Sequence, residues 1–129
     1  MQTKITAIRP GEYLVVYPIE FPPVKTGTVY IFVAIDVYSE FCFHLETEQD
    51  MSSATMLKNI GRLIENKDFL HHRDKGFTLV LHKYEEVLPE MLKIISPYGG
   101  KVIFSDPFVA SVIVPFAETM FTGLAKAKR

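Results

Sequence analysis

The sequence has little of several features that mark whole classes of protein. Cys42 is the only cysteine among 129 residues, which excludes an intrachain disulfide framework and a zinc cluster built on cysteines. The most apolar stretches, residues 29–35 and 108–117, are far shorter than the roughly 20 apolar residues that a membrane span needs. The start, MQTKITAIRP, has no apolar core followed by a small-residue cleavage site. We therefore expect a cytoplasmic protein without a membrane segment.

The chain also lacks an excess of charge of either sign. Fourteen Lys and Arg residues stand against fifteen Asp and Glu residues, which gives a formal net charge of -1 at pH 7. A domain built mainly to hold polyphosphate is normally strongly basic, so this balance argues against that class. With 48% hydrophobic and 22% charged residues, the composition predicts one globular domain over residues 1–129.

The first part of the chain predicts three strands. Residues 13–21 and 28–36 are rich in β-branched and aromatic side chains, and residues 40–46 alternate between apolar and polar ones. The middle segment, TVYIFVAID, is apolar almost throughout, which is typical of a strand buried on both faces. The short connections favour an antiparallel meander.

The rest of the chain predicts alternating helices and strands. A helix begins after Ser52-Ser53 and has apolar residues at helical spacing up to Ile64. A polar loop is expected over 66–76, and then the segments continue in the order strand 77–82, helix 84–95 and strand 101–105. A last helix is expected to begin near Pro115, because proline favours the first helical turn. The order β-β-β-α-β-α-β-α implies an α/β fold with a mixed five-stranded sheet and helices on both faces.

This order and several local sequences resemble the catalytic core of retroviral-type integrases and DDE transposases, which have an RNase H-like fold. The stretch YIFVAIDVYS at 30–39 resembles the family's second strand and the following turn, although Glu40 replaces the usual basic residue. Residues 77–96 are similar to a later strand and helix of the family, and SDPF at 105–108 is similar to the segment before its last helix. The resemblance implies a lead-in over 1–12 and a core over 13–126. Family members usually carry a separate DNA-binding domain before the core, and we expect none here.

The resemblance implies a chemistry that depends on three carboxylates, which hold two divalent cations for DNA integration. Carried onto this sequence, the three positions fall at Pro18, Tyr84 and Glu118. Only Glu118 is acidic, and one carboxylate cannot hold two cations. The resemblance therefore implies a degenerate active site without a metal cofactor and without strand transfer. Asp36 corresponds to a turn residue of the family and not to a metal ligand.

A second hypothesis retains an enzyme. Glu20 lies two residues after Pro18 and so on the same face of a strand, and Glu85 follows Tyr84. Together with Glu118 they would form a displaced carboxylate cluster for Mg²⁺ or Mn²⁺ in an active polynucleotidyl transferase or nuclease. The simpler interpretation makes Glu20 a surface residue at a hairpin end and Glu85 a residue of a first helical turn.

Histidine and cysteine offer no clear alternative site. The four histidines, at positions 44, 71, 72 and 82, lack the spacing of metal ligands on one helix face. Cys42 and His44 would share a strand face, but no third group that would orient them as a nucleophilic pair can be identified. We interpret these residues as structural or as parts of polar loops.

A core without catalysis could still bind DNA or protein. The weak nucleic-acid candidates are basic residues of the first helix and of the C-terminal end, with solvated surface residues as the alternative: Lys58, Arg62, Lys126, Lys128 and Arg129. Segment 108–124, FVASVIVPFAETMFTGL, is unusually apolar, which predicts either core packing or a homodimer interface. The leading hypothesis is a nucleic-acid or protein interaction module from a mobile-element-derived gene.

Overall fold

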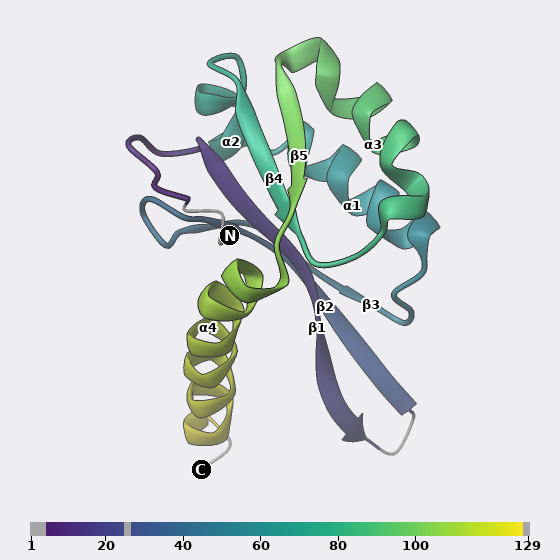
Figure 1. Ribbon diagram of the computed structural model, residues 1–129. Coiled ribbons are helices and arrows are strands. Elements are labelled where there is room, and N and C mark those ends of the chain that lie inside the picture. The colour runs from purple at the N-terminus through teal and green to yellow at the C-terminus, as the bar shows by residue number, and fades with distance from the viewer. Residues whose placement is uncertain (1–4, 25–26, 128–129) are drawn as a thin grey trace.

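A five-stranded sheet forms the centre of the computed structural model, which describes residues 5–24 and 27–127 (Figure 1). The strand order is β3-β2-β1-β4-β5. The first three strands are antiparallel, and β4 and β5 run parallel to β1. This arrangement confirms the predicted α/β fold with an RNase H-like mixed sheet. The strands are β1 (Tyr13–Val24), β2 (Gly27–Asp36), β3 (Cys42–Glu48), β4 (Phe77–Leu81) and β5 (Gly100–Phe104).

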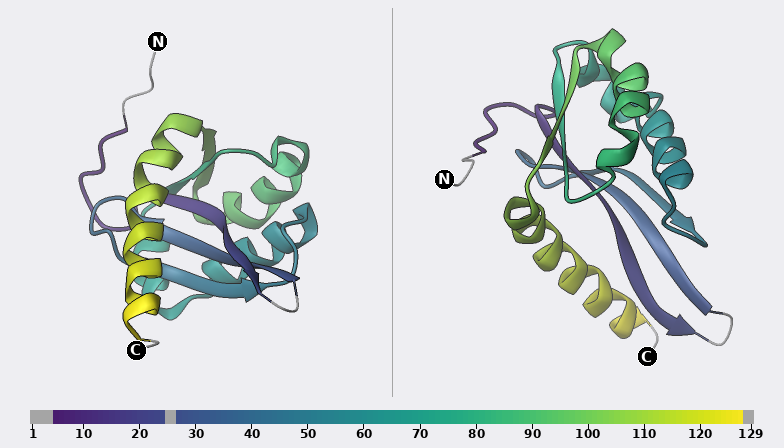
Figure 2. Two further views of the ribbon diagram at one scale, coloured as in Figure 1. Left: turned by 90° about the horizontal axis from the view of Figure 1, so that it is seen from below. Right: turned by 45° about the vertical axis from the view of Figure 1, so that its right-hand side comes forward.

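Helices cover both faces of the sheet, as expected. The helices are α1 (Ser53–Ile64), α2 (Lys67–Arg73), α3 (Leu88–Ile95) and α4 (Asp106–Ala127), with short 3₁₀ turns η1 (Glu85–Val87) and η2 (Ser96–Tyr98). Figure 2 shows α1 and α3 on one face and α4 alone on the other. In the part of the chain that the structure describes, no helix is both long and apolar enough to cross a membrane.

The alternation of β1 divides the core into two parts. Leu14 and Val16 pack in the cluster that contains the buried residues of α1, α2 and α3. Val15 and Ile19 face the other way and pack in the cluster that contains Val109 of α4. A shift of one residue along β1 therefore moves a side chain from one core to the other.

The expected loop over 66–76 is wrong for residues 67–73, which form α2. Asn66 caps this helix, because its side-chain oxygen accepts hydrogen bonds from the backbone N–H groups of Asp68 and Phe69. Phe69 is fully buried and anchors α2 through contacts with neighbouring aromatic rings, among them an edge contact with Phe77 at 5.0 Å between centroids. One well-placed apolar residue and one cap thus stabilise a helix without a periodic apolar face.

The last helix was also predicted wrongly, since it begins at Asp106 and contains Pro115 in its interior. The backbone N–H of Val109 donates to the carbonyl of Ser105 at 3.0 Å, and the N–H of Phe108 donates to the Ser105 hydroxyl. Ser105 therefore acts as a cap, and Pro107 occupies the first turn, where its missing N–H costs nothing. The Ser-Asp-Pro sequence starts the helix.

The predicted helix over 84–95 is shorter than expected and begins at Leu88, after η1. Tyr84 has a left-handed backbone, with φ of 83°, so it cannot belong to a right-handed helix. Its side chain is buried, and its hydroxyl donates to the Met51 carbonyl at 2.7 Å. Burial raises the pKa of Tyr84 to about 12, and the phenol therefore stays protonated.

Asp36 joins three parts of the fold at the end of β2. Its side chain is fully buried, and one carboxylate oxygen accepts a hydrogen bond from the Gly11 N–H at 2.9 Å. The other oxygen accepts from the N–H and the hydroxyl of Ser39, at 3.1 and 2.5 Å. Asp36 therefore holds the segment before β1 against the turn between β2 and β3, and it does so from the last position of β2.

We predict that Asp36→Ala lowers the free energy of unfolding by about 3 kcal/mol, because the substitution leaves buried donors without an acceptor. Urea denaturation of the two proteins measures the difference. The control is Asp74→Ala, at a largely exposed side chain, which should change stability by less than about 0.5 kcal/mol. Equal losses in the two variants would contradict this role for Asp36.

Candidate functional site

The carboxyl end of β4 meets β1 and the start of α4 at one place. β1 pairs with β4 only from Tyr13 to Val15, so Tyr17 lies beyond this ladder. His82 directly follows β4, and its ring centroid lies 4.6 Å from that of Tyr17. These two side chains, with Asp106 from the first turn of α4, line a pocket of about 260 Å³ that we call the strand-end pocket. The carboxyl ends of parallel strands are the usual place for sites in α/β proteins.

The electrostatics of this pocket centre on His82. Its Nδ1 atom is shielded from solvent and has no hydrogen-bond partner among the residues that the structure describes. Partial burial lowers the pKa of His82, and the neighbouring Lys83 lowers it further, against the opposing effects of Asp106 and Glu85. His82 is therefore neutral at neutral pH.

The strand-end pocket does not fit the two divalent cations that the family chemistry implies. Mg²⁺ and Mn²⁺ prefer carboxylate oxygens, and among the described residues that line the pocket Asp106 alone supplies a carboxylate. Tyr17 of β1 and His82, directly after β4, lie beside it. Among the residues that the structure describes, no group of three or more His, Cys, Asp or Glu side chains could hold a metal ion.

The three positions carried over from the resemblance lie on different faces of the sheet. Pro18 is buried and pairs with Phe32, on the side of α1 and α3. Tyr84 is buried in the same core. Glu118 is exposed on α4, which covers the opposite face. The structure therefore does not bring these three side chains into one site.

The displaced carboxylates of the second hypothesis are also apart. Glu20 lies exposed on β1, Glu85 lies exposed at the start of η1, and Glu118 lies exposed on α4. All three belong to the described residues, and they form no metal-binding group there. The residues that do meet, Tyr17 and His82, are one position before Pro18 and two before Tyr84. The alternation of β1 is a sequence signal for the side that Tyr17 faces, whereas His82, which follows β4, has no such signal.

The basic residues predicted on α1 have acidic partners. The Lys58 ammonium lies 2.8 Å from a carboxylate oxygen of Glu48, and Arg62 forms an ion pair with Glu46. These pairs join α1 to β3 and remove most of the local positive charge. Lys126 lies in the last turn of α4, and Lys128 and Arg129 lie outside the described residues.

The remaining histidine and cysteine candidates have structural contacts. The Nε2 atom of His44 shares a hydrogen bond of 2.7 Å with the amide oxygen of Asn59. The Cys42 thiol donates to the His44 carbonyl, and burial raises its pKa, so the thiolate needed for nucleophilic chemistry is disfavoured. His72 packs against Gly11, where a Cβ atom would lie 2.4 Å from the His72 Cβ.

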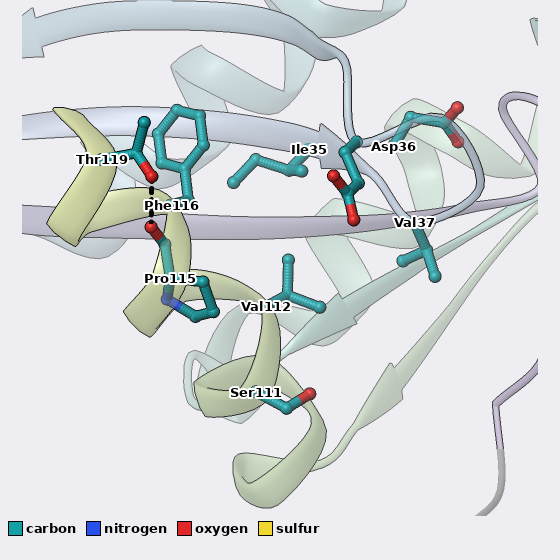
Figure 3. A pocket seen from close by; sticks show the side chains of 9 residues that line it. Ile35, Asp36, Val37, Ser111, Val112, Pro115, Phe116 and Thr119 are labelled. Atoms are coloured by element: carbon teal, nitrogen blue, oxygen red, sulfur yellow. Dashed lines mark hydrogen bonds between the residues drawn. The ribbon is translucent and has the colours of Figure 1, made fainter.

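Segment 108–124 forms most of α4 and borders a second pocket. This pocket, of about 430 Å³, lies between α4 and the end of β2, and we call it the α4 groove (Figure 3). Phe116 and Val112 line it from α4, opposite Ile35 and Val37. The lining is mainly apolar, with Asp36 and Glu40 at the turn that closes one end.

Comparison with known protein families finds no family model that matches this chain, and comparison with curated proteins finds no match. The RNase H-like fold is shared by proteins with different activities, so the fold alone does not assign one. What the chain does must be inferred from its own residues.

We predict that His82 makes the folded protein less stable in mild acid. As the pH falls through 6.5, the unfolded chain takes up the proton before the folded chain does, and the free energy of unfolding falls. Urea denaturation between pH 7.5 and about pH 5 would show a smaller loss for His82→Phe than for the wild type.

The matched control is His71→Phe, at an exposed position of α2. This variant should lose stability in acid as the wild type does. An unchanged pH dependence in His82→Phe would refute the assignment.

Proposed function

We propose that this chain is a degenerate integrase-like or transposase-like core that performs no strand transfer and works as an interaction module. One observation carries the proposal. The strand-end pocket, where β1, β4 and α4 meet, is lined by Tyr17 of β1 and by His82 directly after β4, and its described lining holds one carboxylate, Asp106. Two-metal catalysis needs carboxylates at such a place.

The partner that the surface favours is a second copy of the chain. α4 buries Val109 and Ile113 against the sheet, while Val112 and Phe116 line the α4 groove on another side. Val114 is 53% exposed, so the helix carries more apolar surface than its own core covers. An apolar helix that is open to solvent on one side is typical of a self-association interface.

The same side of the sheet has further apolar surface on its outer strand. Leu45 of β3 pairs with Val33, whose side chain faces the core under α4. Leu45 is nevertheless 54% exposed, because α4 packs mainly on β1 and β4 at the centre of the sheet. The apolar character of this surface favours a protein partner, and on the other face of the sheet the cations Lys58 and Arg62 of α1 are already paired with carboxylates.

We predict that the wild-type chain dimerises and that Val114→Glu weakens the dimer, because a charge in an apolar interface must be desolvated. Sedimentation equilibrium over a range of concentrations measures this. The matched control is Leu70→Glu, at a partly exposed leucine of α2 on the other side of the molecule. A monomeric wild type, or equal weakening by both substitutions, would refute the interface.

We further predict no divalent-metal-dependent cleavage or joining of DNA. An assay with Mn²⁺ and labelled duplex DNA should give no product, and Glu118→Gln should behave as the wild type does. Calorimetry with Mn²⁺ should detect no site. Clear activity that Glu118→Gln abolishes would support the alternative, an active polynucleotidyl transferase or nuclease.

A further inference from the structure

A pocket of different chemistry lies at the opposite end of the parallel strands. It has a volume of about 250 Å³ and is formed where the segment before β1 meets the amino ends of β4 and β5. We call it the amino-end pocket. The residues that give it its chemistry are Arg9, Glu12, Lys75, Thr78 and Lys101.

The amino-end pocket carries a local excess of positive charge. Three of its side chains are cationic and one, Glu12, is acidic. Arg9, Lys75 and Lys101 form no ion pair among the described residues, in contrast to Lys58 and Arg62. The Glu12 carboxylate accepts a hydrogen bond from the Ile8 N–H at 2.7 Å. An anion would compensate the remaining charge.

Arg9 is held in place with part of its guanidinium unused. Its Nη2 donates to the carbonyls of Lys75 and Gly76, at 3.1 and 2.7 Å. Its Nη1 is shielded from solvent and has no acceptor within the described protein. Nη1 is closed to solvent in this arrangement, so Arg9 contributes a fixed positive charge to the wall of the pocket.

Two glycines form one side of the pocket. Gly76 and Gly99 have positive φ angles of 84° and 77°, and each turns the chain just before a strand. A Cβ atom on Gly99 would lie 3.4 Å from the Gly76 Cα atom, so the two turns touch. Both glycines therefore contribute only backbone atoms to the lining of the pocket.

We propose that the amino-end pocket binds the phosphate group of a phosphomonoester. At neutral pH this group carries close to two negative charges. The three cationic side chains and the Glu12 carboxylate together give the pocket a net charge of about +2, which the phosphate would balance. The pocket is smaller than the roughly 300–1000 Å³ of sites for drug-sized ligands, and it suits a single phosphate with the rest of the compound outside. The Thr78 hydroxyl adds a neutral donor. This binding is independent of dimerisation through α4.

Titration with inorganic phosphate, followed by ¹H–¹⁵N NMR at constant ionic strength, tests the proposal. The amide signals of Gly76, Thr78 and Lys101 should shift and reach saturation. Lys101→Ala should weaken the binding about tenfold, because it removes one charged contact to the anion. The matched control, Lys93→Ala, removes the same charge from an exposed position of α3 and should leave the affinity unchanged.

A second titration distinguishes the source of the phosphate. An unphosphorylated single-stranded oligonucleotide offers only phosphodiesters, which carry one charge each, and it should bind more weakly than inorganic phosphate. Absence of saturable shifts with phosphate, or equal weakening in Lys101→Ala and Lys93→Ala, would overturn the proposal. Saturable binding of the oligonucleotide without binding of phosphate would also overturn the phosphomonoester assignment.

Discussion

The short parallel ladder between β1 and β4 determines where the strand-end pocket and the amino-end pocket form. β1 pairs with β2 along nearly its whole length but with β4 over only three residue pairs, Tyr13 to Val15. Beyond this ladder, the end of β4 and the first turn of α4 enclose the strand-end pocket beside Tyr17. Before it, the Thr78 N–H donates to the Glu12 carbonyl at 2.8 Å, and the amino-end pocket forms there. The ladder therefore lies between two pockets of different charge: among the described residues, the strand-end pocket is lined by one carboxylate and no lysine or arginine, and the amino-end pocket is lined by three cations and one carboxylate.

The period of two along a strand explains why the strand-end pocket was not found from the sequence. Pro18 and Tyr17 are neighbours in β1, yet Pro18 lies on the side of α1 and α3 while Tyr17 faces α4. A resemblance that consists of weak local matches can identify a strand, but it cannot align the strand to within one residue, and a shift of one residue moves a side chain to the other face. His82 could not be predicted for another reason. A single histidine after a strand has no periodic spacing that marks it as a site residue, and only the contact with the Tyr17 ring in the folded chain places it in a pocket.

The fold itself could be predicted largely because β1 and β2 are rich in β-branched and aromatic residues and α1 has a clear helical period. The apolar run of β2 and the amphipathic face of α1 each fit one type of element. α2 and the start of α4 could not be predicted in this way, because each is fixed by a cap: Asn66 for α2 and Ser105 for α4. In both cases polar residues that are typical of loops initiate a helix, and tertiary packing of Phe69 or Val109 stabilises it.

The charges of this chain are unevenly distributed, so a net charge of -1 does not exclude a local site for an anion. The acidic residues of β3 neutralise α1, since Glu48 and Glu46 pair with Lys58 and Arg62. The basic residues at helical spacing on α1 are therefore cations whose charge is already compensated. Arg9 and Lys101 lie 92 positions apart in the sequence, and only the parallel order of the strands brings them to one pocket. Because Coulomb interactions fall with distance and are screened within about 10 Å, local charge and not the total decides whether an anion binds.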